Sequence, residues 1–146
     1  CLEAEGGSAG IVRRLVWRIK AGDRSSVLDL AGGDYSAITL DLILAAARDN
    51  DGVSVSVIRD TVKYLAMAVS NMAAVIDPDV IVLGGILESA GDLLFDPIRQ
   101  ECARRMPPGI HERVRIELSQ LGADAAPMGA ARFAHSGSAL PPLSGG

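Results

Sequence analysis

The stretch Asn71–Leu87, with the sequence NMAAVIDPDVIVLGGIL, decides the fold of this chain. A helical pattern of apolar residues ends at Ile76, and Asp77-Pro78 interrupts it, because proline restricts the residue before it and donates no N–H. Val80–Leu83 is short and wholly apolar, which predicts a strand covered on both faces. Gly84-Gly85 then ends the strand. Such a glycine pair either permits a tight turn, the commoner case, or lets a ligand approach the backbone.

Composition indicates one globular domain. The chain has 146 residues, of which 49% are hydrophobic and 3% aromatic, so we expect a core of Ala, Val, Ile and Leu. The formal net charge is −4 and the pI is near 5.1, which argues against a nucleic-acid surface within these residues. The arginine pairs at 13–14 and 104–105 are isolated and typical of solvated helix faces.

Two cysteines, Cys1 and Cys102, are too few for a disulfide framework and suit a reducing cytosol, so we expect a cytoplasmic protein. Cys102 lies in a helical pattern and is predicted to be a small buried hydrophobe. We see no signal peptide and no apolar run long enough to span a membrane. Because the chain begins with Cys, we expect a piece of a longer protein, an engineered protein or a processed product.

Apolar spacing predicts five helices and two strands. The helices are expected from residue 8 to about 20, around 40–47 with Thr39 or Ser36 as cap, over 55–76, over 88–106 and over 124–134 with Asp124 as cap. The strands are Val80–Leu83 and a half-exposed strand at 114–118. Residues 24–34 are expected to form a loop or a marginal turn, and residues 135–146 a flexible tail.

Three details of these elements are also predicted. Met67 and Met72, on the 55–76 helix, are expected to fill the core. Pro97 falls inside the 88–106 pattern, so that helix is expected to begin near Asp96 with Pro97 in its first position. Two short strands cannot cover a fully apolar strand, so the sheet should be incomplete, with its missing strands before Cys1.

The residues contain no complete catalytic set. His111 and His135 are not spaced for a metal site or a catalytic triad, and we expect both to be exposed and inert. Asp77 and Asp79 flank a proline and are explained by capping and turn formation. Cys1 alone cannot bind zinc, which needs four ligands.

Three segments carry a resemblance to a known family: CLEA at 1–4, DPDVIVLGG at 77–85 and LSQLGADAAPMGAA at 118–131. They resemble the C-terminal part of the ROK family, which contains bacterial sugar kinases, sugar-responsive repressors and open reading frames of unknown role. The similarity spans about residues 1–134. It implies an α/β, actin-like (ribonuclease-H-like) ATPase fold of two domains around a cleft. Residues 1–134 would then be the C-terminal part of the second domain, helix-rich with a small incomplete sheet.

The resemblance also implies site residues. Cys1 matches the last cysteine of the family's zinc motif, whose other ligands would precede it. Glu3 matches a glutamate that hydrogen-bonds a sugar hydroxyl, a role that suits a charged acceptor, although it is also explained as an acid at a helix start. Gly84 and Gly85 match glycines on the adenosine side of the nucleotide. Ile86 departs from the family pattern, because many kinase members have a third glycine there.

Two functions follow from the resemblance. One is a sugar-sensing transcriptional regulator that reads DNA only through a missing N-terminal winged-helix domain; Ile86 and the segment 19–26 favour it. The other is a sugar kinase that transfers the γ-phosphate of Mg-ATP to a hexose.

The parent protein would bind a sugar, with ATP, Mg²⁺ and structural zinc as cofactors. The family's phosphate loop and catalytic aspartate are not in these residues, so the chain alone is expected to be inactive and to bind no cofactor. No membrane partner is expected. We expect the protein to form a homo-oligomer. A third interpretation is a family member that serves oligomerisation alone.

Overall fold

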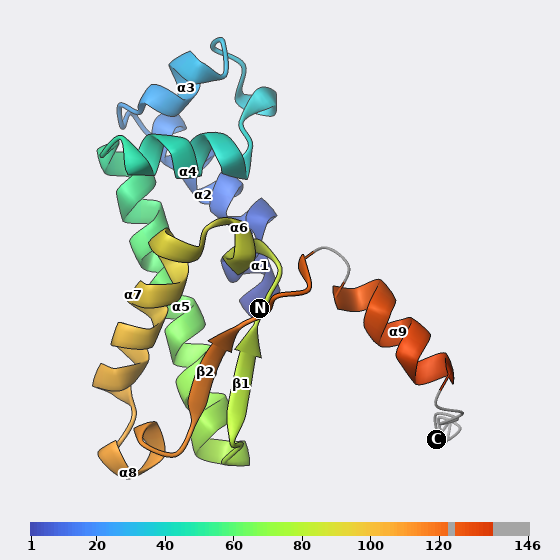
Figure 1. Cartoon of the computed structure of the whole chain (residues 1–146). Helices are drawn as coiled ribbons and strands as arrows, with labels where there is room; N and C mark the ends of the chain where they lie inside the picture. Colours follow the sequence, from blue (N-terminus) through green and yellow to red (C-terminus); the bar gives the residue numbers. More distant parts are fainter. Residues whose placement is uncertain (123–124, 136–146) are drawn as a thin grey trace, which may run out of the picture.

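The computed structural model describes residues 1–122 and 125–135, and helices dominate it (Figure 1). Its elements follow in the order α1 (Leu2–Gly6), α2 (Ser8–Lys20), α3 (Ser26–Leu30), the 3-10 helix η1 (Tyr35–Ala37), α4 (Leu40–Arg48), α5 (Gly52–Ile76), β1 (Val80–Leu83), α6 (Ile86–Ser89), α7 (Gly91–Arg105), α8 (Pro108–His111), β2 (Arg115–Leu118) and α9 (Ala125–His135).

Helix α5 is the spine of the structure. Its 25 residues run the length of the body in Figure 1, with α1, α2 and α4 packed on one part and α7 along another. The Asp51 carboxylate caps the helix by accepting a 2.8 Å hydrogen bond from the backbone N–H of Ser54. At the other end Asp77 adopts a left-handed conformation with φ 50°. The predicted 55–76 helix is confirmed and begins three residues earlier, because Asp51 provides the cap.

Strands β1 and β2 form a parallel sheet in which Val80 pairs with Arg115 and Leu83 with Leu118. Helix α7 makes the crossover between them. One face of the sheet is covered, since Ile81 and Leu83 are half-buried, but Val80 is 37% and Val82 60% exposed. The prediction that β1 is covered on both faces is therefore wrong for the described residues. Helices α5 and α7 pack beneath one face, and no described element covers the other.

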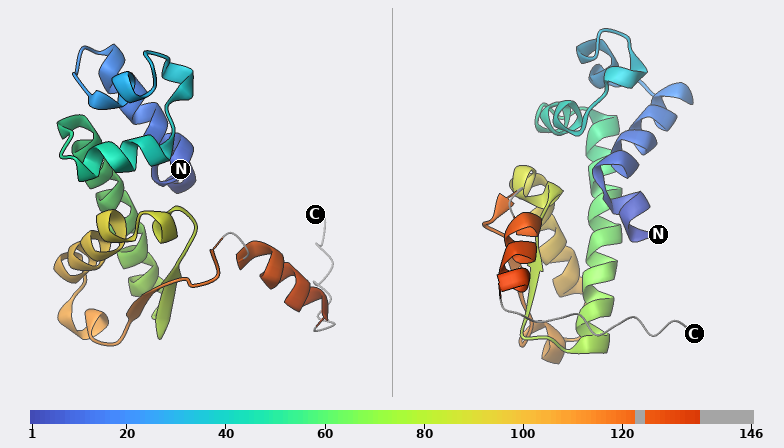
Figure 2. Two further views of the ribbon diagram at one scale, coloured as in Figure 1. Left: turned by 45° about the horizontal axis from the view of Figure 1, so that its top comes forward. Right: turned by 90° about the vertical axis from the view of Figure 1, so that its right-hand side faces the viewer.

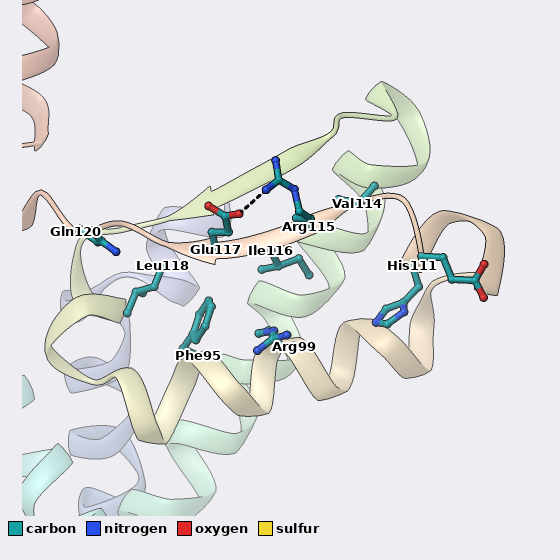
Figure 3. Close-up of a pocket in the computed structure, with 10 residues that line it drawn as sticks. Phe95, Arg99, His111, Val114, Arg115, Ile116, Glu117, Leu118 and Gln120 are labelled. Atoms are coloured by element: carbon teal, nitrogen blue, oxygen red, sulfur yellow. Dashed lines mark hydrogen bonds and ion pairs between the residues drawn. The ribbon is translucent and has the colours of Figure 1, made fainter.

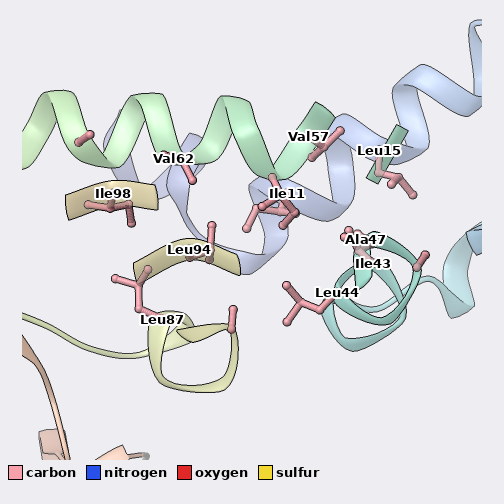
Figure 4. Packing of buried hydrophobic residues seen from close by; sticks show 14 of the residues in the cluster. Ile11, Leu15, Ile43, Leu44, Ala47, Val57, Val62, Leu87, Leu94 and Ile98 are labelled. Carbon is pink, nitrogen blue, oxygen red and sulfur yellow. The ribbon is translucent and has the colours of Figure 1, made fainter. Parts of the chain in front are cut away.

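The core is built from aliphatic side chains, as the composition predicts (Figure 4). Helices α2, α4, α5 and α7 supply most of its fully buried members, among them Ile11, Leu15, Ile43, Leu44, Val57, Leu94 and Ile98. Cys102 is 0% exposed, and its thiol lies 3.7 Å from the carbonyl of Ala66. The prediction of a buried Cys102 is confirmed. The continuous apolar contact among four helices stabilises the chain without a large sheet.

Two short helices replace segments predicted to be irregular. Helix α3 lies within the predicted loop, because the Ser25 hydroxyl caps it at Val27 N (3.3 Å) and the Val27 side chain is fully buried. Helix α1 occupies the polar, glycine-rich start of the chain. The α4 helix has Thr39, not Ser36, as its cap, with a 3.4 Å bond from Leu42 N. Local side-chain hydrogen bonds and tertiary burial thus stabilise helices whose sequence pattern is weak.

The predicted start of the 88–106 helix is wrong. The structure has a short α6 and then α7 from Gly91, so Pro97 lies inside a helix and not at its first position. A proline there has no N–H for the carbonyl of Leu93, which removes one helical hydrogen bond. Burial of Leu94 and Ile98, both 0% exposed, on the two sides of the gap holds the helix together.

The two methionines of α5 are not core residues. Met67 is 46% and Met72 40% exposed, so the prediction that they fill the core is wrong. Met67 lines an open groove beside Cys1 and Leu2. Ala66, Val69 and Ala73, at the same level of α5, are buried, so the two methionines lie outside the buried stripe of the helix.

The C-terminal part is described only to residue 135. Helix α9 is drawn apart from the body in Figure 1 and in the left-hand view of Figure 2, and its Met128 and Phe133 are 52% and 46% exposed. The predicted cap Asp124 and residues 136–146 of the predicted tail (135–146) lie outside the described residues, whereas His135 is the last residue of α9. His111 and His135 are exposed, as predicted. No helix within the described ranges combines the length and apolar character needed to cross a bilayer.

Candidate functional site

The predicted sugar-binding residue Glu3 lies on α1, and the predicted zinc-binding residue Cys1 directly precedes this helix; Glu5 connects α1 to its neighbours. The Glu5 carboxylate pairs with Arg13 at 3.0 Å and with Arg14 at 3.1 Å, both on α2. Arg14 also donates to the hydroxyl of Thr61 on α5, and its guanidinium lies 5.5 Å from the ring centre of Tyr64. Arg14 therefore joins three helices and fixes the position of α1.

Three glycines let α1 approach so closely. A Cβ on Gly10 would lie 2.2 Å from the carbonyl oxygen of Ala4, and one on Gly7 would lie 2.7 Å from that of Glu3. A Cβ on Gly6 would lie 2.9 Å from the side chain of Leu65. Backbone atoms cannot yield to such contacts as a flexible side chain can. We call Gly6, Gly7 and Gly10 with α1 the packed corner; the sequence analysis did not identify it.

Glu3 projects from this corner. Its side chain is exposed, and within residues 1–122 and 125–135 its carboxylate has no hydrogen-bond or ion-pair partner. A free carboxylate on a rigid helix is suited to accept bonds from vicinal hydroxyls. The geometry leaves Glu3 available for a sugar, and its role in binding one stays a prediction.

Cys1 does not form a metal site with the residues present. It is an exposed free cysteine, and the described ranges contain no group of three or more His, Cys, Asp or Glu side chains that could hold an ion. Structural zinc requires four ligands. The residues present do not fit zinc on their own, and the assignment of Cys1 as one ligand of a larger site stays a prediction.

Gly84 and Gly85 lie where β1 ends, at the same edge as the end of β2. Gly85 has φ 69° and ψ −125°, a conformation that L side chains rarely adopt, and no atom lies within 4 Å of the position of its missing Cβ. Gly84 instead lies against β2, because its missing Cβ would be 3.3 Å from that of Ser119. Of the two, Gly85 is open to a ligand.

Glu88 completes this second region, which we call the open corner: Gly84, Gly85, Glu88 and Gly122. The Glu88 side chain bends back from α6, with Oε1 3.3 Å from the missing Cβ of Gly84 and Oε2 3.4 Å from that of Gly122. Oε1 is buried and has no hydrogen-bond partner within the described residues. A buried acceptor of this kind is unfavourable unless a donor reaches it. No sequence pattern identifies Glu88, because its contact with Gly122 exists only in the folded chain.

Ile86 has a structural role in the open corner. It begins α6 and is partly buried against the apolar core. A glycine there would remove this packing and loosen the turn that Gly85 makes. Ile86, which stands where the family pattern has a third glycine, thus stabilises the start of α6.

A separate hollow lies between α7 and β2, away from both corners (Figure 3). Phe95, Arg99 and His111 face Ile116 and Leu118 across it, and the Arg99 guanidinium lies 5.8 Å from the Phe95 ring centre. This hollow contains none of the predicted site residues. Its side chains form no nucleophile–base pair, so we assign it no chemistry.

Comparison with known proteins identifies relatives of the chain. The model of the ROK family matches residues 1–136. A glucokinase of Halalkalibacterium halodurans is 30% identical over 129 residues, which cover 88% of this chain and 39% of that protein. The chain thus spans about two fifths of the length of this curated relative.

Solved structures of both functional classes resemble the fold. A ROK family glucokinase from Streptomyces griseus, in complex with glucose and AMPPNP, superposes with a TM-score of 0.80 at 28% identity and covers 94% of this chain and 45% of its own. A ROK family transcriptional regulator, a homologue of the MLC protein of E. coli, gives 0.67 at 28% identity, over 81% of this chain and 28% of its own. The fold is therefore that of the corresponding part of these proteins, and the chain belongs to the ROK family.

Proposed function

We propose that this chain is the C-terminal part of a sugar-sensing transcriptional regulator of the ROK family. In this proposal Glu3 accepts hydrogen bonds from sugar hydroxyls, and a domain that precedes the chain reads DNA. The similarity to a ROK transcriptional regulator supports the class of protein. The observation that favours a sensor over a kinase is the position of Glu88 in the open corner.

Glu88 opposes nucleotide binding. Its carboxylate occupies the space that Gly84 leaves free, so a ligand must displace it to approach the backbone there. Because the resemblance assigns Gly84 and Gly85 to the adenosine side of the nucleotide, the obstruction concerns the adenosine and not the phosphates.

The test uses the full-length protein that contains this chain. We expect hexose-dependent binding to the DNA upstream of its own gene, measured by fluorescence anisotropy, and no hexose-dependent ATP turnover in a coupled assay. Glu3→Gln should abolish the sugar response, while the exposed Glu112→Gln should leave it unchanged. Hexose-dependent turnover well above background would reject a pure sensor.

A sugar kinase is the second candidate, favoured by the glucokinase relatives and by the higher TM-score of the glucose- and AMPPNP-bound structure. In that case the free Oε1 of Glu88 would accept a hydrogen bond from a nucleotide hydroxyl. The two candidates predict opposite effects of Glu88→Ala on nucleotide affinity. Tighter AMPPNP binding by the variant in calorimetry supports the sensor, and weaker binding supports the kinase.

A further inference from the structure

A groove lies between α5 and α7, and its lining includes none of the predicted sugar and nucleotide residues. The two helices pack along each other in Figure 1, and the groove between them has a volume of about 340 Å³. Ala47 of α4 contributes to its wall. This volume is in the range of small-molecule sites.

The floor of the groove is apolar. Its aliphatic lining consists of Ala47, Val55, Ile58, Val62, Leu93 and Pro97. Val55 is 40% exposed, whereas Ile58 and Val62 are 5% and 7% exposed, so the groove opens to solvent at Val55 and deepens toward the core. Transfer of an aliphatic group into such a site is favourable by about 0.8 kcal/mol for each CH₂ that it buries.

Pro97 shapes the wall that α7 contributes. Its ring is shorter than an extended side chain, and its missing N–H leaves the carbonyl of Leu93 without its helical donor. Both residues line the groove. The helix therefore lacks one backbone hydrogen bond beside the apolar floor, although it continues through Pro97.

The rim carries positive charge. Arg59 and Lys63 on α5 and Arg104 on α7 line it, together with one acid, Glu101. Arg104 pairs with Glu101, and Lys63 lies 3.5 Å from Asp60, but Arg59 has no hydrogen-bond or ion-pair partner within the described residues. The chain as a whole has a net charge of −4, so this local excess of cations is not a result of composition.

We propose that the α5–α7 groove binds a small amphipathic anion, with an aliphatic body of medium length in the groove and one carboxylate at Arg59. The apolar floor selects the body, and the unpaired guanidinium selects the charge. This site is separate from Glu3 and from the open corner, so the proposal does not depend on the assignment as a sensor.

The probe is octanoate, titrated into the full chain by calorimetry, with octan-1-ol as a neutral ligand of matched length. We expect saturable binding of octanoate and weaker binding of octanol. Arg59→Gln should weaken octanoate binding about fivefold, the effect of one partly exposed ion pair of about 1 kcal/mol, and should not alter octanol binding. Val55→Glu should abolish binding of octanoate, because it places a like charge at the mouth of the groove.

The control is Arg24→Gln, which removes an exposed arginine from the connection before α3, outside the groove. It should bind octanoate like the unchanged protein. Absence of saturable binding below the micelle concentration, equal weakening by Arg24→Gln, or octanol binding as tight as octanoate would each overturn the proposal. A further result would also overturn the proposal: the unchanged protein does not bind octanoate, and Val55→Glu alters its sedimentation. In that case a second copy of the chain would occupy the groove.

Discussion

The packed corner and the open corner both depend on glycine, but for opposite reasons. In the packed corner, Gly7 and Gly10 are required because backbone carbonyls occupy the space that a Cβ would need. In the open corner, Gly85 has nothing within 4 Å and is required because of its backbone conformation. A glycine surrounded by protein serves packing, whereas a glycine surrounded by space leaves backbone accessible. Only the second kind marks a surface that a ligand can reach.

The strongest test of this comparison is Gly10→Ala. The new Cβ would meet the carbonyl of Ala4, so α1 must move away from α2, and we expect the free energy of unfolding to fall by about 3 kcal/mol. Urea unfolding followed by circular dichroism measures it. Gly52→Ala is the matched control, since no atom lies within 4 Å of its missing Cβ, and it should be neutral or slightly stabilising. Equal stability of the two variants would contradict the packed corner.

The next test removes the side chain that joins three helices. Arg14→Met deletes the bonds to Glu5 and Thr61 from a side chain that is 18% exposed, and we expect a loss of about 2 kcal/mol in the free energy of unfolding. Arg13→Met removes a 61% exposed partner of the same Glu5, so its loss should stay below about 1 kcal/mol. The same urea unfolding measures both, and a larger loss for Arg13→Met would show that Arg14 does not fix α1.

Gly85→Ala tests the open corner. The side chain has space, but φ 69° is unfavourable for alanine, and we expect a loss of about 1.5 kcal/mol. Gly109→Ala, where φ is not in the left-handed region and no atom lies nearby, is the control and should change stability little. Thermal unfolding measures both. A loss for Gly85→Ala greater than that for Gly10→Ala would reverse the comparison.

The smallest effect concerns Asp51, the cap of α5, which supports both corners. Burial alone would raise the pKa of the Asp51 carboxyl, but hydrogen bonds from the backbone N–H groups of Ser54 and Ser26 outweigh it and hold the pKa below its ordinary value. The stabilisation is therefore present above the unfolded pKa of about 3.9 and is lost as pH falls through the lower folded pKa.

Asp51→Ala should therefore lower stability by about 1 kcal/mol at neutral pH. The difference from the unchanged protein should shrink below about pH 3.9. Urea midpoints measured across this range check the expectation. Asp96→Ala, which removes an exposed carboxyl group within α7, is the control for the loss of one acidic side chain. A constant difference for Asp51→Ala at all pH values would contradict the role of its ionised carboxylate.

Sequence patterns predicted the elements with strong periodicity or clear punctuation. The bounds of β1 were predicted as observed, because Pro78 and Gly84 mark both ends of an apolar run. The long apolar stripe predicted helix α5, and only its first three residues, which follow the Asp51 cap, were not predicted. The continuation of α7 through Pro97 could not be predicted. Burial of Leu94 and Ile98 stabilises a helix that the local preference of proline would end.

The candidate site was only partly visible in the sequence. Glu3, Gly84 and Gly85 were identified by resemblance, and the structure shows that they lie in two different corners. Glu88 and Gly10 were missed, because neither belongs to a motif and each acquires its importance from a residue that folding brings near: Gly122 and Ala4. Such contacts depend on tertiary packing and leave no periodic signal in the sequence.

The contrast between the two cysteines has a practical consequence. Cys1 is exposed, whereas Cys102 is fully buried, and burial raises the pKa of the Cys102 thiol. Because the thiolate is the reactive form, a maleimide dye at neutral pH should attach to Cys1 alone, two residues from Glu3. The labelled chain would report events near Glu3 by fluorescence, and a second dye would attach only when the core opens.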